Sequence, residues 1–302
     1  MTAGDRSRAA AKPGEAPTQL AGRDNRWLRK FRATLRAGKP SADGSIGVEG
    51  PHLVEEALRA GLPVEAILAS AAGERHLGKL APLIPPGIPV LRTSDRLFAG
   101  VADTQTPQGI AALVCPRAAS FDDLVRGRPL VVVLVGVQDP GNVGTILRAA
   151  EAFGATGVAT CTWGGLGTAD PLSPKALRAS AGSALRLPLV HGVATAVLVA
   201  QLRVTAVKLY AASPAKHSSA KQEGRVLNPW EVDLRGPSAL LVGNEGAGVP
   251  LEVQSSADAL VRIPLHSGVE SLNAAVAASV LLYEAARQRG GGAPERDASA
   301  PE

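Results

Sequence analysis

Three loops in the second half of the chain carry residue types that could do chemistry, and the first runs from Gln138 to Arg148. Asn142 stands where a helix N-cap is expected, because its side chain can accept hydrogen bonds from the first free backbone N–H groups. Gly144 and Arg148 lie one helical turn apart, so the glycine leaves space beside the guanidinium. Taken alone, this loop favours a simpler interpretation, a capped helix that carries one surface arginine.

The second loop, from Leu241 to Pro250, contains three glycines within six residues and follows an apolar strand. Glycines allow positive φ and a close approach of the backbone to a ligand. Glu245 lies among them, and a carboxylate argues against a phosphate cradle, which uses backbone N–H groups and usually a lysine. By itself, a glycine-rich turn after a strand is a weak indication of function.

The third loop, from Arg262 to Asn273, leads into a long apolar segment. Ser271 and Asn273 place two hydrogen-bonding side chains at the start of the predicted helix, where backbone N–H groups lack partners. Ordinary capping explains Ser271 well. It explains Asn273 poorly, because strong helix formers follow directly, and we therefore expect Asn273 to have another role.

Several familiar catalytic patterns are absent from the sequence. It contains no phosphate-binding Gly-x-x-x-x-Gly-Lys-Ser/Thr, no His-Glu-x-x-His and no Gly-x-Ser-x-Gly. The nearest dinucleotide fingerprint, at Gly165 to Gly167, lacks its third glycine. The histidines show no metal-ligand spacing, so we predict no metal site. They are His52, His76, His191, His217 and His266.

The three loops follow apolar strands in a repeated order of strand, loop and helix. Leu130 to Val137 is β-branched and apolar without alternation, which is typical of a parallel strand buried on both faces. We predict further strands at 158–160, 239–242 and 260–263, and helices at 143–153, 175–185 and 271–289. Residues 211–228 are polar and predict a loop. The pattern predicts an α/β fold with a mostly parallel sheet in residues 130–289.

The front of the chain predicts a smaller α/β unit. Strands are expected at 45–49, 64–69, 88–91 and 110–114, with helices between them. Before them, Trp27, Phe31 and Leu35 form one apolar stripe on a short helix over 25–36. The expected domains are a disordered basic tail (1–22), a front domain (23–117), a connector (118–129), the parallel-sheet domain (130–289) and a disordered tail (290–302).

Composition sets further limits. The 302 residues are 45% hydrophobic, which suffices for a packed core and excludes a largely disordered chain. Two cysteines exclude a disulfide scaffold and favour a reducing compartment. No apolar run approaches the roughly 20 residues that span a bilayer, and the N-terminus lacks the apolar core of a signal peptide. These features predict a cytoplasmic protein.

The net charge of +5 is unevenly distributed. Residues 1–40 contain ten basic and three acidic side chains, whereas the remainder of the chain is slightly acidic. A concentrated basic arm suits a polyanion, either a nucleic acid or an acidic membrane surface. A solvated tail that only improves solubility explains the charge equally well.

Together the three loops resemble the SpoU (TrmH-like) RNA methyltransferases of the SPOUT class. The resemblance covers 130–289 and rests on three motifs in a fixed order. They are Asn142-x-Gly144-x-x-x-Arg148, Gly243-Asn244-Glu245-x-x-Gly248, and Ile263-Pro264 followed by Ser271-Leu272-Asn273. The front domain resembles the RNA substrate-binding domain often fused to this enzyme, on Val48-Glu49-Gly50 and on Thr106 to Ile110.

The resemblance implies a trefoil-knotted, mostly parallel sheet flanked by helices, preceded by a small α/β RNA-binding domain. It also implies that S-adenosylmethionine is the cofactor and that the protein forms a homodimer through its closing helix. By this resemblance the cofactor is held largely through main-chain groups of Gly243, Ile263 and Leu272, with Asn273 nearby. The apolar and glycine character of those positions agrees with main-chain recognition.

The same resemblance implies a ribose 2′-O-methyltransferase whose catalytic residues are Arg148, Asn142, Glu245, Ser271 and Asn273. In the family, the residue at Arg148 is assigned to activating the 2′-hydroxyl. Arginine is normally protonated in proteins, which makes it a poor base. We hypothesise instead that Arg148 positions the neighbouring phosphate and polarises the hydroxyl, with Asn142 and Glu245 orienting it.

We expect the basic helix to offer Arg26, Arg29, Lys30 and Arg36 to RNA. Ribosomal RNA is the favoured substrate, because the front domain resembles ribosomal proteins that bind folded RNA, and transfer RNA is the alternative. Two other functions stay open at this point. One is a non-catalytic RNA-binding factor for ribosome assembly on the same fold, and the other is an enzyme acting on small nucleotides.

Overall fold

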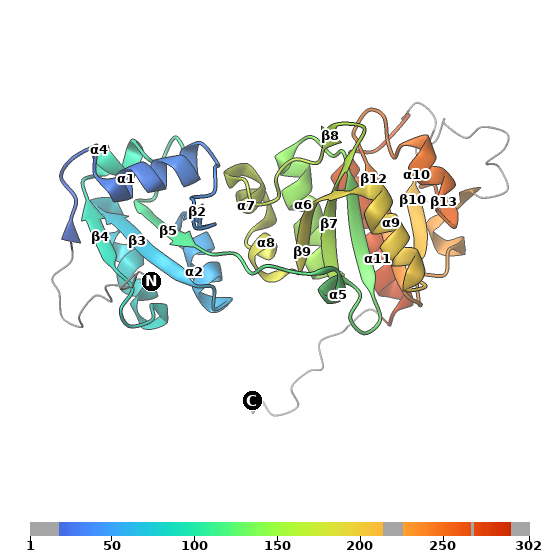
Figure 1. The fold of residues 1–302 in the computed structure, drawn as a ribbon, viewed down its shortest axis with the longest axis horizontal. Coiled ribbons are helices and arrows are strands. Elements are labelled where there is room, and N and C mark those ends of the chain that lie inside the picture. The colour runs from blue at the N-terminus through green and yellow to red at the C-terminus, as the bar shows by residue number, and fades with distance from the viewer. Residues whose placement is uncertain (1–17, 214–225, 267–268, 291–302) are drawn as a thin grey trace, which may run out of the picture. The chain divides into compact units, whose positions relative to one another are not determined.

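A computed structural model describes residues 18–213, 226–266 and 269–290. The chain divides into two compact units, Met1–Arg117 and Ala118–Glu302 (Figure 1). The division falls where the sequence analysis places the start of the connector. The predicted terminal tails lie mostly outside the described residues. Among those residues, no helix is long and apolar enough to cross a membrane.

The first unit is a five-stranded mixed sheet in the order β1-β4-β3-β5-β2. Its strands are β1 (Thr18–Gln19), β2 (Ile46–Glu49), β3 (Val64–Ser70), β4 (Val90–Thr93) and β5 (Ile110–Val114). Its helical segments are α1 (Arg26–Phe31), η1 (Arg32–Arg36), α2 (Pro51–Arg59), η2 (Ala71–Gly73), α3 (Glu74–Leu80), η3 (Ala81–Leu83) and α4 (Asp95–Ala99). The four predicted strands are all present.

Strand β1 corrects the prediction that residues 1–22 are disordered. Thr18 and Gln19 pair in parallel with Leu91 and Arg92 of β4. Leu20 follows with 2% of its surface exposed, and it belongs to the apolar core that also holds Phe31. The pairing depends on a partner strand far along the chain, so local composition gave no sign of it.

The buried stripe on α1 and η1 is formed by Leu28, Phe31 and Leu35, not by Trp27. Steps of three and four residues keep a stripe straight on a helix, whereas two steps of four drift around it. Trp27 is therefore half-buried at the margin, where the Arg26 guanidinium lies 5.4 Å from its ring centroid.

Lys30 differs from the other basic residues of this helix. Its ammonium lies 2.8 Å from an oxygen of Asp43 and 2.5 Å from an oxygen of Glu65. Arg26, Arg29 and Arg36 are exposed. Because Lys30 neutralises carboxylates of its own unit, the geometry gives it a structural role, and it contributes less positive charge to the surface than the sequence count suggests.

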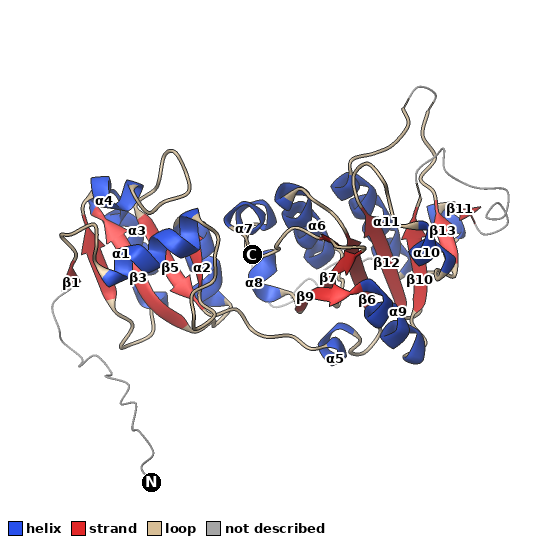
Figure 2. Ribbon diagram, turned by 45° about the horizontal axis from the view of Figure 1, so that its top comes forward, coloured by secondary structure: helices blue, strands red, loops and turns tan. Residues whose placement is uncertain are grey.

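The second unit is a mostly parallel sheet in the order β11-β13-β10-β12-β6-β7-β8, with β9 also paired to β7 (Figure 2). Only the β7–β8 pair is antiparallel among the strand pairs described here. The strands are β6 (Leu130–Val135), β7 (Gly157–Trp163), β8 (Leu166–Gly167), β9 (Leu189–Ala194), β10 (Lys208–Ala212), β11 (Val226–Leu227), β12 (Ser238–Gly243) and β13 (Ala259–Val261). The predicted α/β class with a mostly parallel sheet is confirmed.

Helices cover both faces of this sheet. They are α5 (Phe121–Leu124), α6 (Pro140–Ala152), α7 (Pro174–Ser180), α8 (Ser183–Arg186), α9 (Thr195–Val204), η5 (Pro229–Glu231), α10 (Leu251–Ser255) and α11 (Ala274–Gln288). On one face Val131, Val133 and Val135 pack with α9 and α10. Helices α6 and α11 contact each other and strands of the sheet. All six residues of β6 are buried, as expected for a central parallel strand.

Several segments of this unit differ from the sequence prediction, and β8, β10, β11 and α10 are among the elements that it did not contain. The connector contains α5, whose Leu124 is fully buried in the core of the second unit. The expected helix at 175–185 is two helices, because Ala181 and Gly182 take left-handed conformations. Strand β9 and helix α9 were not predicted. The expected loop at 211–228 begins inside β10 and ends in β11 and Asn228, while 214–225 lie outside the described residues.

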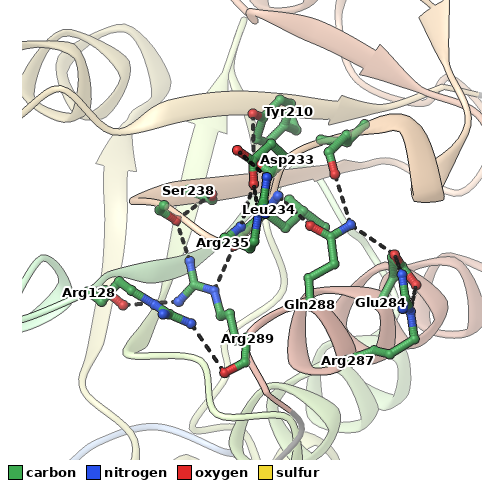
Figure 3. Close-up of polar contacts among 12 residues, drawn as sticks. Arg128, Tyr210, Asp233, Leu234, Arg235, Ser238, Glu284, Arg287, Gln288 and Arg289 are labelled. Carbon is green, nitrogen blue, oxygen red and sulfur yellow. Dashed lines mark hydrogen bonds and ion pairs between the residues drawn. The ribbon is translucent and has the colours of Figure 1, made fainter.

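Helix α11 is anchored at its C-terminal end by Arg289 (Figure 3). The guanidinium donates to the carbonyl oxygens of Leu234, Gly236, Arg128 and Pro129 at 2.6–3.0 Å. These carbonyls belong to the segments that enter β6 and β12. The guanidinium thus joins the last helix to the amino ends of two central strands.

Candidate active site

The three polar loops of the sequence lie together at the carboxyl ends of β6, β12 and β13. Asn142 comes from the turn after β6, Glu245 from the turn after β12, and Asn273 from the segment after β13. Because these strands are parallel, their carboxyl ends meet at one edge of the sheet, which is where ligands bind in open α/β sheets.

A chain of hydrogen bonds joins the three loops, and we call Asn142, Glu245 and Asn273 the polar cluster. The Asn273 amide nitrogen donates to Asn142 Oδ1 at 2.9 Å. The Asn142 amide nitrogen then donates to Glu245 Oε1, also at 2.9 Å. A carboxylate can only accept, so it fixes which end of each amide faces its neighbour.

Asn273 begins α11 as its N-cap. Its Oδ1 accepts from the backbone N–H groups of Ala275 at 2.8 Å and Val276 at 3.3 Å. The expectation that Ser271 caps this helix is therefore wrong. Asn273 performs both roles, because an amide can accept with its oxygen from the helix end while its nitrogen donates across to Asn142.

Helix α6 begins earlier than predicted, and Asp139 rather than Asn142 is its N-cap. Asp139 Oδ1 accepts from Gly141 N at 2.8 Å, and Pro140 occupies the first helical position, where a missing N–H costs nothing. The ammonium of Lys175, 2.6 Å away, lowers the pKa of Asp139. Asn142 is thereby released from capping and free to join the polar cluster.

Glu245 is held as an anion. Burial opposes its ionisation, but hydrogen bonds from Asn142 and from the backbone N–H groups of Gln138 and Asp139 outweigh burial and lower its pKa below 4.5. The stabilisation from these donors is complete above the ordinary pKa and is lost as pH falls through the lowered value. As an anion the carboxylate accepts these hydrogen bonds, and it thereby fixes the orientation of the Asn142 amide.

The turn after β12 folds around Asn244. The side-chain oxygen of Asn244 accepts from the N–H groups of Gly246 and Ala247, and its amide nitrogen donates to the Gly136 carbonyl at 3.0 Å. Gly243 faces the return of the same turn, where an added Cβ would lie 2.1 Å from the Gly248 carbonyl carbon. Gly243 therefore allows the backbone of the turn to pack closely against itself. The sequence analysis expected a glycine here to allow the backbone to approach a ligand.

A pocket opens between this turn, the end of β13 and the start of α11. Its lining includes Gly243, Glu245, Ile263, Ser271 and Leu272 among the predicted site residues. The remaining lining is mainly small or apolar, and it comprises Ala212, Ser213, Val242, Asn244, Gly246, Gly248, Val261, Leu265, Glu270, Ala274 and Ala277. Asn142, Asn273 and Arg148 are not among the residues that line it. Of the polar cluster, only Glu245 therefore lines the pocket.

The structure does not bring Arg148 to this pocket. Arg148 follows Asn142 by six positions on α6. At 3.6 residues per turn, its side chain therefore lies about 240° around the helix axis from that of Asn142. Arg148 is exposed. Gly144 does not provide space for the guanidinium as expected, because an added Cβ there would lie 2.3 Å from the Ala176 carbonyl oxygen of α7. The glycine is needed for the close packing of α6 against α7.

Sequence reasoning missed several residues of the site. Asn244, which shapes the turn, stood inside the quoted motif and could have been recognised from the tendency of Asn to hydrogen-bond the backbone two residues on. Ala212 and Ser213 line the pocket from the end of the unpredicted β10, and nothing local marked them. Among the described residues, no group of three His, Cys, Asp or Glu side chains could hold a metal ion.

Two family models match the chain. Residues 129–283 match the SpoU rRNA Methylase family, and residues 40–112 match the MRM3-like substrate binding domain. The 23S rRNA (guanosine(2553)-2′-O)-methyltransferase RlmP of Bacillus subtilis (strain 168) is 36% identical over 88% of this chain and 98% of that protein. The 23S rRNA (guanosine-2′-O-)-methyltransferase RlmB of Xylella fastidiosa (strain 9a5c) is 31% identical, over 88% of this chain and 97% of that protein.

Two similar solved structures contain a bound methyl donor. The SpoU methyltransferase AviRb from Streptomyces viridochromogenes, in complex with AdoMet, is 28% identical with a TM-score of 0.74, over 89% of this chain and 100% of that one. The AdoMet-bound rRNA methyltransferase from Sinorhizobium meliloti is also 28% identical with a TM-score of 0.74, over 89% of this chain and 97% of that one. Both similarities extend across the two units.

Proposed function

Because this chain belongs to the SpoU rRNA methylase family and is an S-adenosylmethionine-dependent 2′-O-methyltransferase of RNA, we propose that its substrate is ribosomal RNA and that the pocket beside α11 binds the donor. The substrate proposal is supported by the full-length similarity to RlmP and RlmB, which act on 23S rRNA. An rRNA substrate further supports action in the cytoplasm.

This proposal rests on the pocket that the second and third loops line together, with the first loop hydrogen-bonded to both. Gly243, Ile263 and Leu272 would hold the donor through main-chain groups, since their side chains are absent or apolar. The apolar wall suits an adenosine, and the carboxylates of Glu245 and Glu270 suit a cation. When bound, S-adenosylmethionine supplies a methyl group on a positively charged sulfur.

The polar cluster acts in this proposal by positioning. Asn142 bridges Glu245, in the turn after β12, and Asn273, at the start of α11. These hydrogen bonds hold the two segments at a fixed distance from each other. Such preorganisation matters because in-line methyl transfer demands alignment of the reacting atoms. Ser271 lines the pocket next to Leu272 and completes its polar surface.

We propose that Arg148 holds an RNA phosphate. It is exposed and does not line the donor pocket, and a guanidinium binds phosphate through two parallel hydrogen bonds. Arg148→Lys keeps the charge but loses this fork, so turnover on ribosomal RNA should fall at least about 100-fold while donor affinity stays unchanged.

One experiment tests the substrate and the role of Arg148 together. Ribose methylation is mapped across total RNA from cells with the wild-type chain, with Arg148→Lys, or without the protein. One rRNA position should lose its methyl group in the last two strains. Loss of methylation at a tRNA position would show that the substrate is tRNA and not rRNA. No loss at any position would favour a non-catalytic factor. Normal methylation in the Arg148→Lys strain would refute the proposed phosphate contact of Arg148.

We also propose that the second unit is knotted, as the resemblance implies, and that two copies associate through α11. Val276, Val280 and Tyr283 form an exposed apolar stripe along this helix, with Tyr283 58% exposed. Sedimentation velocity should give twice the chain mass of 30.8 kDa. Tyr283→Glu should give the single-chain mass, whereas the control Val204→Glu, at a valine that is 87% exposed on α9, should stay dimeric. A monomeric wild type would refute the dimer.

A further inference from the structure

The charged side chains that line the donor pocket are both acidic. Glu245 and Glu270 line it, and the described lining residues include no lysine, arginine or histidine. The rest of the lining is small, apolar or uncharged. A pocket of this kind attracts cations and gives no electrostatic advantage to a neutral ligand.

The two carboxylates are not equivalent. Glu245 belongs to the polar cluster and accepts from Asn142 and from two backbone N–H groups, so its removal would disturb the architecture of the site. Glu270 is exposed, precedes α11 and does not belong to the polar cluster. A substitution of Glu270 therefore leaves the three residues of the polar cluster themselves unchanged.

The reaction itself changes the charge of the ligand. The sulfur–methyl bond breaks with its electron pair remaining on sulfur, the methyl group bonds to the ribose oxygen, and the hydroxyl proton is released. The sulfonium cation thereby becomes the neutral thioether S-adenosylhomocysteine. Substrate and product differ by one methyl group and one positive charge, and a small methyl group gives only weak discrimination.

We propose that Glu270 is a specificity-determining residue that makes the pocket prefer the cationic donor over the neutral product. This inference rests on the proposed donor site. The negative pocket loses its attraction for the ligand at the moment of transfer. The preference limits inhibition by the accumulated product and favours exchange of product for fresh donor.

Isothermal titration calorimetry of the full chain tests the inference with three ligands. They are S-adenosylmethionine, S-adenosylhomocysteine, and sinefungin, an unreactive analogue that carries a protonated amine near the position of the sulfonium. In Glu270→Gln the affinities for the two cations should fall about 5-fold, a size expected for an exposed charge, and the affinity for the thioether should stay within about 2-fold. Glu252→Gln, at an exposed glutamate outside the pocket lining, should change none of the three.

A salt series on the wild-type chain gives a second readout that needs no variant. Binding of the two cations should weaken as ionic strength rises, while binding of the thioether should not. Equal losses for all three ligands in Glu270→Gln, or identical salt dependence, would overturn the inference and leave the donor site standing. A wild-type chain that binds none of the three would instead refute the proposed donor site and, with it, this inference.

Discussion

Gly243→Ala is expected to abolish donor binding while most of the fold persists. The new Cβ would lie about 2 Å from backbone atoms of Gly248 and Val249, which cannot move aside as a flexible side chain could. The turn after β12 must therefore open, and it forms one wall of the pocket and holds Glu245. We expect donor affinity to fall about 100-fold, or about 3 kcal/mol, which is the upper end of the usual cost of overpacking.

Gly246→Ala is the matched control in the same turn. A Cβ at this position would meet only the Asn244 side-chain oxygen, at 3.6 Å, which is an ordinary contact. Both variants are compared by calorimetric titration with the donor and by circular dichroism. Donor binding by Gly243→Ala at the level of Gly246→Ala would contradict the structure of this turn.

Arg289→Ala is expected to produce the largest loss of stability. Truncation leaves four carbonyl groups at the amino ends of β6 and β12 without their charged donor, and part of this surface is shielded from water. Hydrogen bonds from charged groups contribute about 1.5–3 kcal/mol each but do not add fully, so we expect the free energy of unfolding to fall by about 3 kcal/mol. Urea denaturation measures it.

The neighbouring Arg287 provides the control. It pairs with Glu284 on the same helix, and its side chain is 56% exposed. Arg287→Ala should cost less than about 1 kcal/mol, as for other exposed ion pairs. An equal decrease in the free energy of unfolding for both variants would show that the hydrogen bonds from Arg289 to the four carbonyls contribute no more than an exposed ion pair. Arg289→Lys should fall between them, since an ammonium cannot reach all four acceptors in one plane.

The sequence predicts the central architecture well because strong local patterns determine it. The pattern from Leu130 to Val135 is typical of a strand buried on both faces, and the structure places it in the middle of the parallel sheet. The front strands were predicted for the same reason. Strand β1 was missed, because its two residues become a strand through pairing with β4 and not through their own pattern.

In the candidate site, the local sequence does not predict which residue caps each helix. Asn142 and Ser271 both sit in sequences that suit an N-cap, yet Asp139 and Asn273 perform the capping. The choice between adjacent candidates depends on hydrogen-bond partners from other loops, such as Glu245 for Asn142. Gly144 is a similar case, since its partner is a carbonyl on α7 and no feature of its own helix indicates this.

Lys30 shows the same limit for charge. Counting residues assigns it to the basic surface, but Asp43 and Glu65 approach it from 13 and 35 residues away. An interaction between residues far apart in the sequence cannot be read from either segment alone. The exposed Arg26, Arg29 and Arg36 remain the predicted RNA contacts of this helix.

The order in which the polar cluster is encoded has a consequence for biosynthesis. Asn142 and Glu245 leave the ribosome before Asn273, which opens the last helix among the described residues. A nascent chain therefore cannot close the cluster before Asn273 is synthesised, and contacts across separations of 103 and 131 residues form slowly. A chain that stops before α11 lacks Ala274 and Ala277 of the proposed donor pocket, and retention of a labelled donor analogue would test whether the newly made protein has matured.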